Sequence, residues 1–379
     1  MSGLRAQCLV DLDAIAASTE TLKRAAGDAA VLAVVKADGY GHGLLPSARA
    51  ALRGGATWLG TATLDEALAL RAAGVTAPVL SWLAVPGEPL VDGVRHGIDL
   101  SASAPWAITE LDTAARAAGR AARVHLKVDT GLTRGGARAG DDWRDLLDAA
   151  AKAQAEGTVE VAGVWTHLVH ADQPGSATTT AQRTILLAAA AEAEARGLHG
   201  FLRHLANSAA TLTRPDTHLD LVRPGLAVYG LTPVPEVASA AELGLRPAMS
   251  LTARVALTKR VPAGATVSYG ATHTTAAETT TALVPLGYAD GVPRAGSGAL
   301  EVLLGGRRRR VAGRVCMDQF VVEVGDDPVA AGDEVVLFGP GTGGEPTADE
   351  WAQVLGTINY EVVTRVGSRV PRTYLGSGA

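Results

Sequence analysis

The first two-thirds of the chain alternates short runs of β-branched residues with alanine-rich runs whose apolar residues recur at helical spacing. We expect eight strands, at Val31–Lys36, Thr57–Thr61, Pro78–Trp82, Ile98–Ser101, Arg123–Asp129, Val159–His167, Phe201–Leu205 and Asp220–Val222. The helical runs between them include Leu64–Ala73, Thr109–Ala118, Trp143–Ala155 and Gln182–Arg196. A glycine closely follows each of these helical runs, as at helix C-caps. Successive β/α units are typical of a (β/α)8 barrel, although a doubly wound open sheet uses the same alternation.

The pattern changes after about residue 235, where Pro233 and Pro235 indicate a connection. Short β-rich runs separated by Gly, Pro and Asp turns follow, at Met249–Arg260, Thr266–Ser268, Thr280–Leu286, Glu301–Leu304, Arg308–Val315, Phe320–Val324 and Glu334–Leu337. A helix is expected at Thr347–Leu355, with Thr347 or Asp349 as its N-cap. The sequence therefore predicts an α/β fold with an N-terminal (β/α)8 TIM-like barrel over residues 10–235. A mainly β C-terminal domain is expected over residues 236–379, and residues 1–9 can add a strand to it.

Composition excludes several classes of protein. The 379 residues are 47% hydrophobic and carry a net charge of −5, which suits a globular domain and gives no basic surface for nucleic acid or an anionic membrane. No uncharged apolar stretch reaches the ~18 residues of a membrane span, and the N-terminus lacks the apolar core of a signal peptide. The two cysteines, Cys8 and Cys316, do not form a disulfide framework. A cytoplasmic setting is expected.

Polar residues gather where the expected barrel strands end. Lys36 ends the first strand, and a lysine kept from water can lose its proton and form a Schiff base. Later strand ends carry Lys127, Asp129, Arg134, His167, Asn207, Ser208, Arg223 and Gly225. Taken singly, each has an ordinary structural explanation, such as an ion pair or a helix cap. Together they predict a site at the carboxyl-end rim of the barrel.

A family resemblance rests on motifs that keep one order along almost the whole chain. They are VVKADGYGHG, KVDTGLTRGG, GVWTHL, HLANSAA, DLVRPGLAVYG, SYG at 268–270, GYADG at 287–291, GRVCMD at 313–318, NYEV and RVPR. The set resembles alanine racemases, enzymes of fold type III that use pyridoxal 5′-phosphate (PLP). One such motif is weak, whereas many in order are specific.

The resemblance implies that the chain interconverts L-alanine and D-alanine and so supplies D-alanine for peptidoglycan. Lys36 would carry PLP and act as one acid/base group at Cα. Tyr269 would act from the opposite face and come from the other subunit of a head-to-tail homodimer. Small-molecule alanine would be the ligand, with no nucleic acid, membrane or metal involved.

The resemblance also assigns supporting roles. Arg223 would bond the pyridine nitrogen of PLP, with His167 beside the ring. Tyr40, Asn207, Ser208, Gly225, Leu226 and Tyr360 would hold the phosphate. Arg134, Met317, Asp318 and Tyr288 would bind substrate or line the entrance, and Lys127 would be carbamylated to orient Arg134. An unmodified Lys127 paired with Asp129 is the alternative.

Three other functions remain open at this point. A racemase for serine or for a broader set of amino acids would share the barrel and the chemistry. A non-catalytic PLP carrier would share only the barrel, and a fold-type III decarboxylase would need a different C-terminal motif from GRVCMD.

Overall fold

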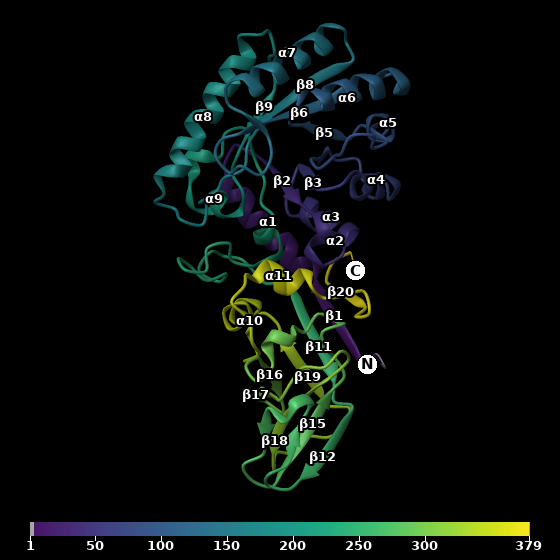
Figure 1. Ribbon diagram of the computed structural model, residues 1–379, viewed down its shortest axis with the longest axis vertical. Coiled ribbons are helices and arrows are strands. Elements are labelled where there is room, and N and C mark those ends of the chain that lie inside the picture. The colour runs from purple at the N-terminus through teal and green to yellow at the C-terminus, as the bar shows by residue number, and fades with distance from the viewer. Residues whose placement is uncertain (1–3, 379) are drawn as a thin grey trace.

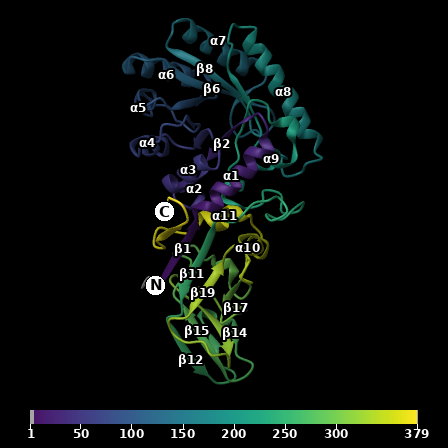
Figure 2. The same cartoon turned by 180° about the vertical axis from the view of Figure 1, so that it is seen from behind.

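A computed structural model describes residues 4–378, and residues 1–3 and 379 lie outside the described part. The first three residues of the strand expected over residues 1–9 therefore lie outside the described part. Figure 1 shows an elongated molecule with the purple and teal segments at one end and the green and yellow strands at the other. Figure 2 shows the same division from behind.

The N-terminal half forms a nearly closed parallel barrel. Within residues 4–378, eight strands follow the order β10-β2-β3-β4-β5-β6-β8-β9. Their bounds are Ala30–Val34 (β2), Trp58–Thr61 (β3), Val79–Ser81 (β4), Asp99–Ala102 (β5), Ala122–Asp129 (β6), Val159–Trp165 (β8), Leu202–His204 (β9) and Leu221–Val222 (β10). Backbone hydrogen bonds from Asp220 N to Arg203 O (3.2 Å) and from Arg223 N to Ala206 O (2.8 Å) join the β9 and β10 segments. The predicted barrel is confirmed, and the open sheet is wrong because its two edge strands would stay apart.

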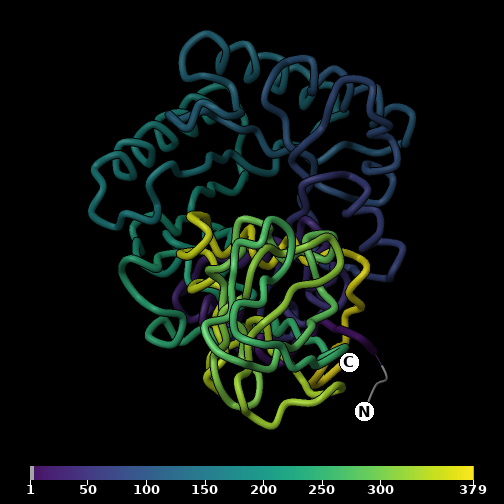
Figure 3. The backbone as a smooth tube through the Cα atoms, turned by 60° about the horizontal axis from the view of Figure 1, so that its bottom comes forward, coloured from purple at the N-terminus to yellow at the C-terminus, as the bar shows by residue number. Residues whose placement is uncertain are grey.

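Helices cover the outside of this barrel (Figure 3). They are α1 (Leu12–Ala26), α3 (Leu44–Arg53), α4 (Leu64–Ala72), α5 (Leu90–Arg95), α6 (Pro105–Ala118), α7 (Asp141–Ala155), α8 (Ala177–Glu194) and α9 (Ser208–Thr213). The Asp11 side chain caps α1 by accepting from Asp13 N and Ala14 N, and buried Ile15 and Leu22 fix its inner face. None of the helices in the described residues is long and apolar enough to cross a membrane.

The C-terminal half is built on a second sheet, of order β12-β15-β18-β17-β16-β19-β11-β1-β20. The strands are β1 (Ala6–Asp11), β11 (Met249–Arg254), β12 (Leu257–Val261), β15 (Thr279–Val284), β16 (Glu301–Leu304), β17 (Arg307–Ala312), β18 (Phe320–Gly325), β19 (Glu334–Phe338) and β20 (Arg372–Leu375). The N-terminal strand β1 pairs antiparallel with β11 and parallel with β20. Consequently, both ends of the described chain lie in the same sheet (Figure 1).

Two sequence expectations need correction. The single strand at Met249–Arg260 is two strands, because Val255 N bonds Asp333 O while Ala256 N bonds Leu283 O. The chain therefore changes partners, from β19 to β15, between β11 and β12. The strand expected at Val31–Lys36 ends at Val34, and Lys36 begins a separate short turn, α2 (Lys36–Tyr40).

Three smaller elements complete the β domain. The helix expected at Thr347–Leu355 is α10 (Ala348–Leu355), and Thr347 is its N-cap within a capping box completed by Glu350. A helix that the sequence pattern did not predict, α11 (Asn359–Thr364), follows it and faces the barrel. A two-stranded ribbon, β13 (Thr266–Val267) and β14 (His273–Thr274), carries the turn that includes Tyr269.

Candidate active site

A cavity of about 670 Å³ opens at the carboxyl ends of the barrel strands. Its wall includes the predicted residues Lys36, Tyr40, Lys127, Arg134, His167, Asn207, Ser208, Arg223, Gly225, Leu226 and Tyr360. All but Tyr360 come from the barrel half, on segments that follow or end different strands, and Tyr360 comes from α11 of the β domain. Active sites of this architecture form at that end of the barrel.

Lys36 stands at the start of a left-handed turn. Residues 37–40 have φ between 52° and 62°, so α2 winds in the sense opposite to an ordinary helix. For a non-glycine residue this conformation costs about 1–2 kcal/mol. The turn is held partly by Glu66, whose carboxylate accepts from Ala37 N at 2.6 Å. Strain concentrated at one short segment of a cavity wall is typical of a functional site.

The surroundings of Lys36 favour its neutral amine. Burial lowers the pKa of Lys36 below its ordinary value, and the nearby Arg134 lowers it further. The Glu66 carboxylate partly offsets this effect. The lysine nitrogen lies 5.8 Å from the centroid of the Trp82 ring, on an apolar wall. A deprotonated lysine amine is a nucleophile toward an aldehyde.

Cationic side chains surround the same space. Burial, followed by the charges of Arg223 and Arg134, lowers the pKa of Lys127 to about 8. The same neighbours, after burial, hold the pKa of His167 well below its ordinary value, so its ring is neutral at neutral pH. The clustered lysines and arginines suit an anionic ligand, because an anion relieves their mutual repulsion.

Arg223 is fixed on several sides. The residue is 5% exposed, and its guanidinium donates to His204 Nδ1 at 3.1 Å and to Thr166 O at 2.7 Å. The guanidinium carbon lies 4.8 Å from the centroid of the Trp165 ring. Burial lowers the pKa of Arg223 to about 9, which still leaves the group protonated at neutral pH. A guanidinium has more N–H donors than these contacts use, so it can also donate into the cavity.

The loops after β9 and β10 form a compact polar corner. Ser208 Oγ accepts from Gly225 N at 2.8 Å and from Ala227 N at 3.3 Å. A Cβ added at Gly225 would lie 2.3 Å from Tyr40 Oη, so only glycine allows this close approach. The Asn207 side chain caps α9. Backbone N–H groups at such helix starts favour a phosphate or carboxylate.

Four predicted residues do not line this cavity. Tyr269, Tyr288, Met317 and Asp318 lie on the β domain, and the first three are 72%, 44% and 53% exposed. Their loops are joined to one another, since Tyr288 N donates to Cys316 O at 3.0 Å. The loop of Tyr269 is joined to them through Ser268 Oγ, which donates to Arg314 O at 2.7 Å.

Sequence reasoning missed three aromatic groups of the site. Trp82 and Trp165 line the cavity, and the ring of His204 stacks on Trp165 with an interplanar angle of 4°. Trp82 directly follows β4 and Trp165 ends β8, so the strand-end signal that identified Lys36 applied to them as well. His204 ends β9 in the same way, but it does not line the cavity and contacts it only through Trp165 and Arg223.

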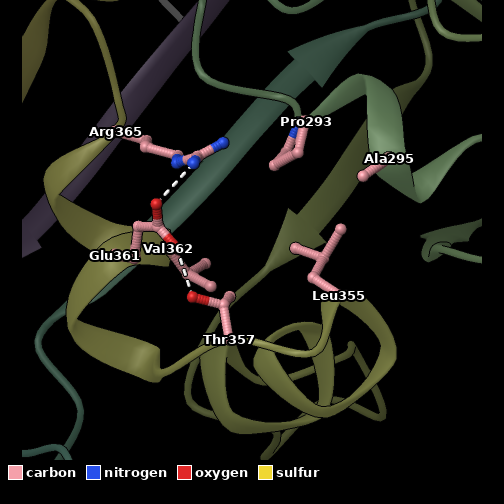
Figure 4. A pocket seen from close by; sticks show the side chains of 7 residues that line it. All are labelled: Pro293, Ala295, Leu355, Thr357, Glu361, Val362 and Arg365. Atoms are coloured by element: carbon pink, nitrogen blue, oxygen red, sulfur yellow. Dashed lines mark hydrogen bonds and ion pairs between the residues drawn. The ribbon is translucent and has the colours of Figure 1, made fainter.

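A smaller hollow of about 80 Å³ lies in the β domain between Pro293, Leu355 and α11 (Figure 4). Its one carboxylate, on Glu361, already accepts from Thr357 and pairs with Arg365. None of the predicted site residues lines it. The barrel cavity is therefore the candidate active site.

A barrel with a lysine of lowered pKa and a cationic cavity at its mouth, joined to a β domain, defines a two-domain barrel enzyme. Residues 10–233 match the family description "Alanine racemase, N-terminal domain", and residues 248–374 match "Alanine racemase, C-terminal domain". A curated alanine racemase of Frankia casuarinae is 63% identical over 98% of this chain and 97% of its own length.

Solved structures agree. The alanine racemase from D-cycloserine-producing Streptomyces lavendulae superposes with a TM-score of 0.98 at 53% identity, over 100% of this chain and 98% of that one. The Bacillus anthracis alanine racemase with bound L-Ala-P superposes with a TM-score of 0.89 at 35% identity, over 100% of this chain and 97% of that one. The chain belongs to the alanine racemase family, whose members are isomerases.

Proposed function

We propose that the protein interconverts L-alanine and D-alanine, with PLP held in the barrel cavity. The observation that carries the proposal is the meeting, in one cavity, of a lysine amine of lowered pKa, a buried arginine and the polar corner formed by Ser208 and Gly225. The matches to relatives span both domains, which argues against a carrier that shares only the barrel and against a decarboxylase.

The donor set fits PLP. The corner built from Asn207, Ser208, Gly225, Leu226 and the two tyrosines Tyr40 and Tyr360 would hold the phosphate. Lys36 would bind the aldehyde carbon, and Arg223 would donate to the ring nitrogen. When bound, PLP supplies an electron sink that makes the Cα–H bond of an amino acid acidic.

The side chains then divide the proton chemistry. Lys36 Nζ would take or return the Cα proton on one face, and Tyr269 Oη would do so on the other. Arg223 keeps its own proton because its pKa stays above neutral, so a ring nitrogen held by this guanidinium would remain unprotonated. This arrangement would limit side reactions that need a stronger electron sink. Neutral His167 would lie beside the ring.

The residues outside the cavity would reach it from a second copy of the chain. Tyr269, Tyr288 and Met317 form an exposed, largely apolar cluster with Asp318. The barrel mouth also exposes apolar side chains, at Leu83 and Trp106. We propose a head-to-tail homodimer in which the partner's cluster covers the mouth, so that Tyr269 faces Lys36 across the interface. Arg134, Met317 N–H and Asp318 would bind the substrate, with Tyr288 at the entrance.

Purified protein supplemented with PLP is expected to form D-alanine from L-alanine until the two are equal, because the enantiomers have the same free energy in water. Chiral chromatography of both directions measures this. Parallel assays with serine and lysine test the broader-specificity alternative. One small group on a substrate changes the free energy of transition-state binding by only ~1–3 kcal/mol. Failure to convert any amino acid would contradict the proposal and favour a non-catalytic carrier.

Lys127 is expected to carry a carbamate. Its amine is partly neutral near pH 8, and carbon dioxide reacts only with the neutral amine, so occupancy should rise as the pH rises through about 8. The anionic carbamate would then attract Arg134 where the ammonium repels it. Incubation with ¹³C-bicarbonate should give a carbamate carbon signal that is lost in acid and missing in Lys127→Ala. An identical signal in that variant would contradict the assignment.

We further propose that residues 10–235 form the cofactor-binding domain and residues 236–379 the second domain, to which β1 adds a strand. The two free cysteines of the described chain are consistent with a reducing, cytoplasmic setting. There the product D-alanine would serve peptidoglycan synthesis.

A further inference from the structure

A chain of buried polar side chains runs from Arg223 down through the inside of the barrel. His204 Nδ1 lies 3.1 Å from the Arg223 guanidinium, and His204 Nε2 lies 2.9 Å from His125 Nδ1. His125 Nε2 then lies 3.1 Å from Asp99 Oδ2. Both histidines are fully buried, and Asp99 is 3% exposed. The strands that carry these residues, β5, β6 and β9, lie near one another in the barrel (Figure 1).

Only one arrangement of protons satisfies this chain. A guanidinium can only donate, so His204 Nδ1 must accept and be unprotonated. A neutral imidazole carries one proton, so His204 Nε2 donates to His125 Nδ1. His125 must then donate from Nε2, and the Asp99 carboxylate accepts. Every hydrogen bond is therefore donated in the direction from Arg223 toward Asp99. This is also the direction that the carboxylate requires, because a carboxylate can only accept.

The residues around His125 and His204 leave room for their hydrogen bond and hold the two rings in place. A Cβ added at Gly163 would lie 2.1 Å from His125 Nδ1, so glycine at this position leaves room for the contact between the two histidines. Trp165 stacks flat on His204 and is fixed by donating from Nε1 to Ser101 Oγ at 2.9 Å. Ser101 in turn donates to His125 O at 3.1 Å. Burial lowers the pKa of His204, which favours the neutral ring that the chain requires.

The hydrogen-bonded series of side chains ends at Asp99, near the amino-terminal ends of the barrel strands. Asp99 begins β5, and its Oδ1 accepts from Arg123 Nε at 3.0 Å. Arg123 also pairs with Glu160, near the start of β8. Asp99 is thus too far along the strands to touch a ligand at the mouth, and it can act there only through the two histidines.

We propose that Asp99 is a positioning residue for Arg223: its carboxylate sets the tautomers of His125 and His204, so that an unprotonated His204 Nδ1 holds the guanidinium aimed into the cavity. The part of this inference that concerns PLP rests on the proposed function. The part that concerns the tautomers does not.

The tautomers are tested directly by neutron diffraction from deuterated, PLP-supplemented protein. Deuterium is expected on Nε2 of both His125 and His204 and on Nδ1 of neither. A deuteron on Nδ1 of either ring overturns the proposal. This measurement uses the unaltered protein, so it does not depend on the folding of any variant or on turnover.

The effect on Arg223 is tested with Asp99→Asn. A carboxamide can donate to His125 Nε2. The direction of donation through His125 and His204 can then reverse, which places a His204 Nδ1–H against the guanidinium. The reversal would remove the hydrogen bond from the charged Arg223 guanidinium to His204 Nδ1. We therefore expect the dissociation constant for PLP to rise by about 10- to 100-fold. Quenching of tryptophan fluorescence during titration of the PLP-depleted protein with PLP measures it.

Asp220→Asn is the matched control, since Asp220 binds Arg203 on β9 at 2.8 and 3.1 Å and makes no contact with the histidine chain. An unchanged PLP affinity in the control together with a weakened affinity in Asp99→Asn supports the proposal. Equal changes in the two variants, or no change in Asp99→Asn, overturn it. If the unaltered protein binds no PLP, the proposed function fails, while the neutron result still decides the tautomers.

Discussion

Replacing Lys36 by alanine is expected to abolish racemisation, with a loss of at least about 10⁴-fold in kcat/KM. The substitution removes both the amine that would bind the aldehyde carbon of PLP and one of the two groups that move the Cα proton. Loss of a positioned acid/base group alone costs about 10²- to 10⁴-fold. The near-visible absorbance of the lysine-bound cofactor should vanish as well. Chiral assay and an absorbance scan of the same preparation measure the two effects together.

The matched control is Lys152→Ala, which removes an exposed lysine from α7 and leaves the cavity untouched. It should retain both activity and absorbance. If Lys36→Ala kept the absorbance band, another lysine would carry the cofactor, and Lys127 would be the first alternative because its pKa is also lowered. That result would contradict the assignment of Lys36.

Replacing Tyr269 by phenylalanine is expected to lower racemisation by about 10²- to 10⁴-fold, because only the phenol oxygen that moves the proton is removed. Cofactor absorbance should stay, since Lys36, the residue that would bind the cofactor, is unchanged. The effect should also be one-sided. In D₂O, the variant should still exchange the Cα proton of D-alanine through Lys36, while exchange into L-alanine is lost. Proton NMR of each enantiomer separates these outcomes.

A mixed dimer tests whether Tyr269 crosses the interface. One subunit would carry Lys36→Ala and the other Tyr269→Phe. If each site combines Lys36 of one subunit with Tyr269 of the partner, one of the two sites in the mixed dimer keeps both groups, and about half of the wild-type rate returns. If each subunit supplied both groups to its own site, neither site would be complete. An inactive mixed dimer would therefore contradict the head-to-tail arrangement.

The chemistry of the cavity could be anticipated from the sequence because it follows strand ends. Lys36, Lys127, His167 and Arg223 each come at or just after an apolar run, and parallel strands bring their carboxyl ends to one rim. The pattern specified which end of each strand carries polar residues, and this is a local property of the chain. The same reasoning could not place Tyr269, since its relation to the cavity depends on how separate domains and subunits meet.

The precise backbone at Lys36 could not be anticipated in the same way. The apolar run favours a strand through Lys36, yet the strand ends at Val34 and residues 37–40 turn left-handed. Such a turn is unfavourable for a non-glycine residue by itself. It persists because contacts from elsewhere stabilise it, including the Glu66 carboxylate on Ala37 N.

By itself, the sequence determined the repeating strand and helix units, the change to β structure after about residue 235, and the residue types at each strand end. These depend on neighbours within a few positions of each other in the chain. The tertiary structure alone decided that the barrel nearly closes, that β1 joins the sheet of the distant β domain, and that Asp99, His125 and His204 form one hydrogen-bonded chain to Arg223. Each of these needs atoms far apart in sequence to meet at bonding distance, and only the packing of the whole barrel brings them there.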